Sequence, residues 1–259
     1  MTPARTYRRR RLNGGRNVMD LKGSVAVVTG GTGGLGRNLV TQLLDRGAAK
    51  VYVATRKAEE MPGTTALKLD VTDPDSAVAA AKVAADATLL INNAGVNTHA
   101  SLVDGDFADI RREMEVAYFG SLNVTRAFAP VIEANGGGAI LNVCSQLSWV
   151  HFTGTGAYSG SKAAEWALTN ATRFELAPRG IQVSGLYLGY MDTPLFADAP
   201  EKLKSDSASV AARALDGIAA GDDEIFGDDF TGWVKEIMGE SPDDFAHSIQ
   251  SRATRVLQS

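Results

Sequence analysis

The sequence contains little cysteine and little histidine. Cys144 is the only cysteine among 259 residues, which excludes an internal disulfide and a cysteine metal cluster. The three histidines are scattered, without the spacing of metal ligands. We therefore predict no metal site, and we expect a reducing, cytoplasmic setting.

Long apolar runs are also lacking. No segment approaches the roughly 18 apolar residues that a membrane span needs. Hydrophobic residues make up 44% of the chain and charged residues 22%, as in ordinary globular proteins. We predict a soluble protein with no membrane partner. Since no shift in composition divides the body of the chain, we expect one large domain there.

Acidic residues are absent from residues 1–18, which hold six arginines, although the whole chain has a net charge of −4. Arginine-rich starts can bind nucleic acid or act in targeting. Here no apolar stretch follows, and the acidic remainder would repel a phosphate backbone. We predict a disordered tail, either an upstream extension or a misassigned start, and no nucleic-acid partner.

The most informative stretch is residues 24–37, S-V-A-V-V-T-G-G-T-G-G-L-G-R. An apolar run typical of a buried parallel strand stops at Gly30. Five of the seven residues from Gly30 to Gly36 are glycine, and an amphipathic helical pattern follows them. A strand, a bare turn and a helix start direct backbone N–H groups at one place, where a phosphate can bind. A flexible loop is the alternative, but the position favours a dinucleotide site.

Apolar strand patterns and helical patterns alternate after this turn. Helices are predicted at about 35–46, 74–85, 107–133 and 158–177, and further strands at 50–54, 66–69, 88–92, 139–143, 182–187 and 224–226. This predicts an α/β fold, a single doubly wound parallel sheet of Rossmann type with helices on both faces. Residues 19–240 would form the dinucleotide-binding and catalytic domain. Residues 241–259 would form a C-terminal helix or tail, packed on this domain or against another subunit.

Five motifs in order resemble those of short-chain dehydrogenases/reductases. The glycine turn reads T-G-x-x-x-G-x-G, N-N-A-G follows at 92–95, Y-S-G-S-K occupies 158–162, and G-Y-M-D-T occupies 189–193. The fifth element is Ser145, 13 residues before Tyr158. The resemblance extends over about residues 21–229.

Tyr158 and Lys162 carry the catalytic signal. Four residues apart on a helix, they share one face, so the ammonium would stabilise a phenolate and lower the tyrosine pKa toward working pH. Alone, the pair also fits an ordinary amphipathic helix. The resemblance implies that Ser145 polarises a substrate carbonyl, that Tyr158 exchanges a proton with its oxygen, and that Lys162 binds the cofactor ribose.

The resemblance also implies the cofactor contacts. Arg56 follows the second strand, where an NAD-preferring enzyme usually has an acid, and a guanidinium pairs well with a 2′-phosphate, so we predict NADP(H) in preference to NAD(H). Asp70 would accept a hydrogen bond from the adenine amino group. The predicted cofactor-binding residues are Gly30, Thr32, Gly33, Gly34, Leu35, Gly36, Arg56, Asp70, Val71, Asn92, Ala94, Gly95, Tyr158, Lys162, Gly189, Met191 and Thr193.

Two positions depart from the family pattern. Leu188 replaces a proline before the segment that fixes the nicotinamide face. Ala117 replaces an asparagine that helps to hold a water passing protons to the active-site lysine. If the helix still bends there, its backbone carbonyl can hold that water; if alanine has straightened the helix, the regular i to i−4 bond consumes the carbonyl.

The leading hypothesis is an NADP-dependent oxidoreductase that interconverts a carbonyl and an alcohol on a small, hydrophobic substrate. A nucleotide-binding protein with a regulatory role and a redox-neutral biosynthetic relative are the alternatives, and Ala117 is the feature that supports them. The resemblance further implies a homo-dimer or homo-tetramer. The residues expected to line the substrate pocket are Asn97, His99, Leu147, Trp149, His151, Phe152, Tyr190 and Phe196.

Overall fold

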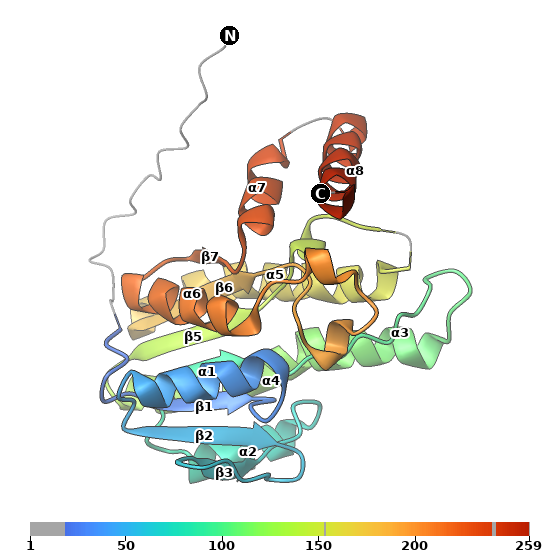
Figure 1. Cartoon of the computed structure of the whole chain (residues 1–259). Helices are drawn as coiled ribbons and strands as arrows, with labels where there is room; N and C mark the ends of the chain where they lie inside the picture. The colour runs from blue at the N-terminus through green and yellow to red at the C-terminus, as the bar shows by residue number, and fades with distance from the viewer. Residues whose placement is uncertain (1–18, 153, 240–241, 259) are drawn as a thin grey trace.

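The computed structural model describes residues 19–152, 154–239 and 242–258 (Figure 1). The predicted tail, residues 1–18, lies outside the described residues. Ser241 and Ser259, at the two ends of the predicted C-terminal segment, also lie outside them.

One seven-stranded parallel sheet forms the centre of the molecule, in the order β3-β2-β1-β4-β5-β6-β7 (Figure 1). The strand order reverses between β1 and β4, and at such a reversal the loops on the two sides diverge and leave room for a ligand. The strands are β1 Val25–Thr29, β2 Lys50–Thr55, β3 Thr65–Lys68, β4 Leu89–Asn92, β5 Gly138–Val143, β6 Ile181–Tyr187 and β7 Glu224–Phe226.

Helices cover both faces of the sheet, so the side chains that alternate along its central strands enter an apolar cluster on either side. In β1, Ala26 and Val28 belong to one apolar cluster, which includes α1 and α6, whereas Val27 belongs to a second, which includes α2 and α4. This confirms the predicted α/β fold with a doubly wound parallel sheet. The helices are α1 Gly34–Asp45, α2 Pro74–Val83, α3 Phe107–Met114, α4 Ser121–Ala134, α5 Gly156–Leu176, α6 Ser207–Ala220, α7 Asp229–Ile237 and α8 Pro242–Gln258.

The predicted strand ends agree with the structure to within one residue, but the helices differ in two respects. Helices α6 and α7 were not predicted. The predicted helix at 107–133 is interrupted, because a π-helix, Glu115–Gly120, separates α3 from α4.

Helix α8 packs on the same chain. Ile249 is buried in the cluster that also holds Val234 of α7, and the Arg252 guanidinium lies 4.4 Å from the centre of the Trp233 ring. Part of α8 therefore packs against α7 of its own chain.

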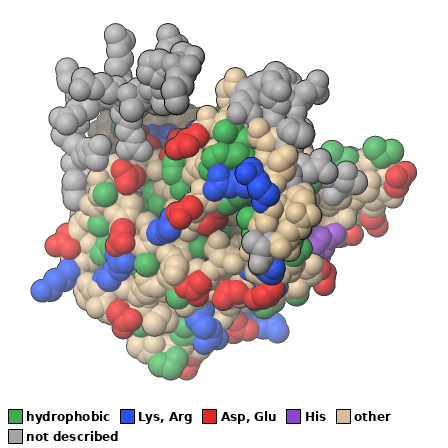
Figure 2. Space-filling view, turned by 45° about the horizontal axis from the view of Figure 1, so that its top comes forward, with side chains coloured by type: hydrophobic (Ala, Val, Ile, Leu, Met, Phe, Trp, Pro, Cys, Tyr) green, Lys and Arg blue, Asp and Glu red, His purple; other side chains and the backbone are tan. Residues whose placement is uncertain are grey.

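Charged side chains of both signs are interspersed over the face shown in Figure 2. Within the described part of the chain, none of the helices has both the length and the apolar character to cross a membrane. Those residues also include no group of three or more His, Cys, Asp or Glu side chains placed to hold a metal ion.

Candidate active site

A cavity of about 1380 Å³ lies at the carboxyl ends of the strands. Its walls come from the glycine turn after β1, the segments after β2, β3, β4 and β6, and helices α3 and α5. Ligands of doubly wound sheets bind in this position. The predicted site residues on its walls are Gly30, Thr32, Gly33, Gly34, Leu35, Arg56, Asp70, Val71, Ala94, Gly95, Tyr158, Lys162, Met191 and Thr193.

The glycine turn has a conformation and a packing that need glycine. Gly30 and Gly34 have φ of 64° and 49°, in the left-handed region that side chains disfavour. A Cβ at Gly36 would collide with the Gly30 carbonyl and come within 2.7 Å of Nδ2 of Asn93. Gly36 therefore lets α1 start close to the turn. It is absent from the cavity wall, although the sequence analysis predicts it to bind the cofactor.

The N-terminus of α1 is open toward the cavity. Its N-cap is Gly33, which makes no side-chain capping bond, and no acid lies in the first helical turn. The first N–H groups of a helix have no partner within it, and the helix dipole makes this end positive. This end of α1 can therefore bind an anionic phosphate.

The segment after β4 is fixed to the glycine turn by hydrogen bonds. The N–H groups of Asn93 and Ala94 donate to Oγ1 of Thr29 at 2.9 and 3.0 Å. Asn92 points elsewhere, because its Nδ2 donates to Oγ1 of Thr125 and to Oδ1 of Asn142. Asn92 joins β4 to β5 and α4. It is absent from the cavity wall, so its assignment as a cofactor-binding residue is not supported by its position.

The segment after β2 brings both positive and negative side chains to the cavity wall. Arg56 directly follows β2 and is exposed at the wall. Glu59 lies on the same wall, where its Oε2 accepts a hydrogen bond from the Thr32 hydroxyl at 3.0 Å. We had not identified this acid, which lies three residues beyond the arginine.

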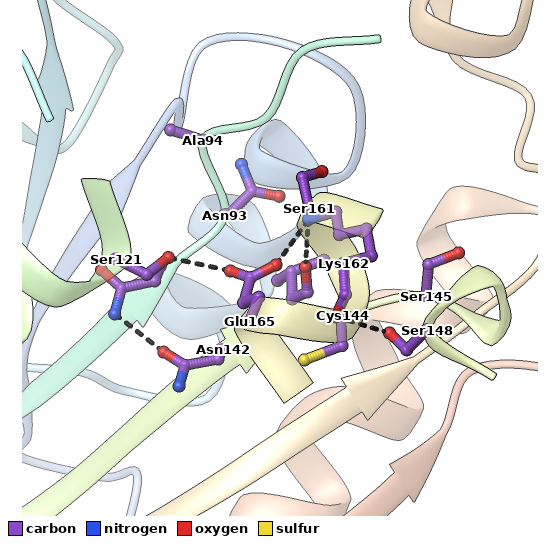
Figure 3. Close-up of polar contacts among 12 residues, drawn as sticks. Asn93, Ala94, Ser121, Asn142, Cys144, Ser145, Ser148, Ser161, Lys162 and Glu165 are labelled. Atoms are coloured by element: carbon purple, nitrogen blue, oxygen red, sulfur yellow. Dashed lines mark hydrogen bonds and ion pairs between the residues drawn. The ribbon is translucent and has the colours of Figure 1, made fainter. Parts of the chain in front are cut away.

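Tyr158 and Lys162 both lie buried on α5, at the cavity wall. Nζ of Lys162 is 5.7 Å from the centre of the Tyr158 ring, and it donates to the Val143 carbonyl at 2.8 Å. It also forms an ion pair with Oε2 of Glu165 at 2.7 Å. The structure therefore brings Tyr158 and Lys162 together. Glu165, the carboxylate partner of Lys162, was not predicted from the sequence (Figure 3).

Ser145 and Gly189 do not lie on the cavity wall. The Ser145 hydroxyl accepts from the Leu147 N–H at 3.1 Å and donates to the Leu188 carbonyl at 3.3 Å, so it caps the short turn after β5. The Gly189 N–H donates to Oδ2 of Asp228 at 2.9 Å. Cys144 and Leu188, the immediate neighbours of these two residues, do line the cavity.

The pKa of Tyr158 is raised, against the predicted lowering. Burial raises the pKa of this phenol most, the Lys162 ammonium lowers it, and the Glu165 and Glu113 carboxylates raise it again. Tyr158 therefore stays protonated at neutral pH. Burial by itself lowers the pKa of Lys162, but Glu165 and Tyr158 hold it above its ordinary value.

The helix around Ala117 has not become a regular α-helix. Ala117 is buried within the π-helix, in which the wider i to i+5 bonding interrupts the regular i to i−4 pattern. Gly120 ends this segment, and a Cβ there would come within 2.9 Å of the Val71 side chain. Of the two alternatives for Ala117, the structure therefore does not correspond to the regular, straightened α-helix.

Most residues expected to form the substrate pocket lie elsewhere. Of that set, only Phe196 lines the cavity, 6.4 Å edge-on from the Tyr158 ring. Trp149 instead stacks on Tyr187 at 4.4 Å, while Phe152 is exposed. The lining residues that the sequence analysis did not predict are Ala54, Thr55, Lys57, Glu59, Leu69, Thr72, Asn93, Val96, Ala108, Arg111, Arg112, Glu115, Val116, Val143, Cys144, Leu188, Pro194 and Leu195.

Comparison with known proteins identifies the family. The short chain dehydrogenase family model matches residues 24–204 of the chain. The chain belongs to the short-chain dehydrogenase family. A short-chain dehydrogenase from Burkholderia cenocepacia, solved in complex with NADP, is 35% identical with a TM-score of 0.84, over 89% of this chain and 99% of that one.

Curated relatives of this short-chain dehydrogenase act on different substrates. An NADPH-dependent 1-acyldihydroxyacetone phosphate reductase of Schizosaccharomyces pombe is 36% identical over 63% of this chain, and the match spans 58% of that relative. A cis-4-hydroxycyclohexanecarboxylate dehydrogenase of Sinomonas cyclohexanicum is 35% identical over 78% of this chain and 85% of its own length. The family prediction is confirmed, and this family is one of oxidoreductases that use nicotinamide cofactors.

Proposed function

We propose that this chain is an NADP(H)-dependent oxidoreductase that interconverts a carbonyl and an alcohol on a small, hydrophobic substrate. The observation that carries the proposal is one cavity that joins the open N-terminus of α1 to the buried pair of Tyr158 and Lys162. The NADP complex of the Burkholderia cenocepacia relative and the NADPH dependence of the Schizosaccharomyces pombe relative support the cofactor choice.

The residues present fit this cofactor. The α1 N-terminus would bind the pyrophosphate, Arg56 the 2′-phosphate, Lys162 the nicotinamide ribose, and Met191 and Thr193 would contact the nicotinamide end. When bound, the cofactor supplies or accepts the hydride. A Cβ at Gly33 would meet no atom within 4 Å, which leaves space beside the helix start.

Tyr158 would exchange the proton. Its raised pKa keeps the hydroxyl protonated at neutral pH, which is the form that donates to a carbonyl oxygen during reduction. The Lys162 ammonium would stabilise the phenolate that remains. Ser145 directly follows Cys144, which lines the cavity, and its hydroxyl would polarise the same oxygen.

The substrate class follows from the wall nearest Tyr158. Phe196 contacts the Tyr158 ring edge-on, and Tyr190 contacts Phe196 at 5.5 Å. Met191 and Leu195 also line the cavity. These side chains favour a hydrophobic carbonyl compound. The relatives that act on an acylated and on a cyclohexane substrate are consistent with this class.

We also propose a cytoplasmic homo-dimer or homo-tetramer. The support for this assembly is the resemblance to the family given above. Light scattering of the purified protein would test the assembly. The regulatory and redox-neutral alternatives rest on Ala117, which lies in the π-helix and offers no side-chain anchor for the relay water.

The test is an assay of NADPH absorbance with a panel of hydrophobic ketones and aldehydes. We expect substrate-dependent oxidation of NADPH by the wild type and none by Tyr158→Phe. NADPH binding without turnover on any member of a broad panel would favour the regulatory alternative.

A further inference from the structure

Glu165 is a buried carboxylate that the mechanism above leaves unused. Its side chain is 1% exposed and the Lys162 side chain 5%, so their ion pair is shielded from water. A carboxylate buried at this depth costs free energy unless its oxygens are paired. Both oxygens have partners, since Oε2 pairs with Nζ of Lys162 and Oε1 accepts from the Ser121 hydroxyl at 2.8 Å.

Figure 3 shows Glu165 between Ser121 on one side and Lys162 on the other. Ser121 is the first residue of α4 and directly follows the π-helix that contains Ala117. The bond from Ser121 therefore ties α5 to the end of the π-helix. Ala117 offers only a methyl group in this segment, whereas Glu165 brings a charged group to it from the neighbouring helix.

The ion pair also restricts the ammonium. Lys162 has three N–H donors, of which one goes to the Val143 carbonyl and one to Glu165. A single N–H donor is left for the cavity that Lys162 lines. Without Glu165, this long side chain would keep one protein acceptor and more rotational freedom.

Several charged or titratable groups besides Glu165 influence the pKa values of Tyr158 and Lys162. Tyr158 and Lys162 raise or lower each other's pKa, Cys144 directly after β5 is a buried thiol, and the Glu113 carboxylate of α3 raises the pKa of Tyr158. Arg173, further along α5, acts on Cys144. Glu165 is the acid in direct contact with Lys162.

We propose that Glu165 is a positioning residue, which fixes the Lys162 ammonium beside Tyr158 and sets the pH range over which Tyr158 exchanges its proton. This inference rests on the proposed function for its kinetic consequences, but it concerns contacts present in the protein itself. A negative charge next to the pair disfavours loss of a proton from either member, so it raises the apparent pKa of the pair whichever group titrates.

The decisive variant is Glu165→Gln, which keeps the shape and the acceptor for Ser121 but removes the charge. We expect the apparent pKa of the pair to fall by on the order of one unit and kcat to fall about tenfold, with little change in KM for the carbonyl. Glu165→Asp separates charge from geometry: the pKa should stay near that of the wild type, while kcat falls because the shorter side chain no longer holds Lys162.

A tyrosinate absorbance titration without cofactor gives a readout that needs no turnover. Tyr158→Phe identifies the contribution of Tyr158 to this titration. Glu133→Gln is the control, because Glu133 forms a 2.7 Å ion pair with Arg179 outside the cavity. It should leave the titration and the kinetics unchanged.

The outcomes separate this inference from the proposed function. An unshifted titration in Glu165→Gln overturns the inference, even if the wild type proves to be an active reductase. A shifted titration in a protein without turnover supports the inference and counts against the proposed function. If Glu165→Gln does not fold, Ser121→Ala and Glu165→Asp decide: a kcat equal to that of the wild type in both overturns the inference.

Discussion

Replacing Gly33 with aspartate should stabilise the protein and weaken cofactor binding at the same time. Gly33 is the N-cap of α1, with φ −135° and ψ 161°, a conformation open to any residue. A Cβ there meets no atom within 4 Å, so the substitution causes no collision. The aspartate can accept hydrogen bonds from the free N–H groups of α1, which are the groups that we assign to the cofactor pyrophosphate.

The two effects have different sizes. An N-cap interaction, a favourable charge at the helix dipole and the loss of glycine flexibility together contribute about 1 kcal/mol to the free energy of unfolding, or roughly 2–4 °C in Tm. Repulsion between the carboxylate and the pyrophosphate about 4 Å away is worth up to about 4 kcal/mol at an effective dielectric constant near 20. We expect NADPH binding to weaken roughly 100-fold, equivalent to about 2.7 kcal/mol.

Gly33→Asn is the matched control, because asparagine has the same shape and caps a helix without charge. Thermal unfolding without cofactor and fluorescence titration with NADPH would measure both quantities. Asparagine should raise Tm similarly while costing much less affinity than aspartate. Equal NADPH affinities of the aspartate and asparagine variants would refute the assignment of the α1 N-terminus to phosphate.

Three further predictions concern the cavity. Tyr158→Phe should abolish turnover and leave NADPH affinity nearly intact, because only the exchangeable proton is lost; parallel kinetics and fluorescence titration would show this. Arg56→Glu should raise the Kd for NADPH far more than that for NADH, and an equal loss for both would withdraw Arg56 as the discriminator. Ala117→Asn should raise kcat by roughly tenfold or less, because the π-helix already interrupts the regular bonding and Glu165 already holds Lys162. An unchanged or slower rate would show that the proton moves by another route.

The strands and the glycine turn could be predicted from the sequence because their physical requirements are local. A strand buried on both faces needs a continuous apolar run, as residues 25–28 show, and the turn needs glycine where φ is positive. Helix α6 was not predicted, although its two ends carry local signals. Asp206 caps its N-terminus, and Gly221 ends it in the left-handed conformation.

The π-helix and the substrate wall depend on tertiary packing. Gly120 packs against Val71, a residue far away in the sequence, so nothing local to the helix predicts where it widens. Loops have no periodicity to show which side chains face a cavity, and Trp149, expected in the pocket, stacks on Tyr187 instead. Glu165 had a visible signal, three residues after Lys162 and on the same helical face, but such spacing usually belongs to exposed ion pairs.

The charges around Tyr158 bear on the direction of the reaction. One ammonium, Lys162, favours the phenolate, while burial and the carboxylates of Glu165 and Glu113 oppose it, and the pKa of Tyr158 is raised as a result. A protonated phenol can donate to a carbonyl oxygen but cannot accept a proton from an alcohol. Reduction should therefore be fast at neutral pH and slow as the pH rises through the Tyr158 pKa, whereas oxidation should accelerate over the same range. Rates of both directions on one carbonyl and alcohol pair, measured from neutral to alkaline pH, would test this. Oxidation already at its maximum at neutral pH would mean that bound cofactor outweighs the burial and the two carboxylates.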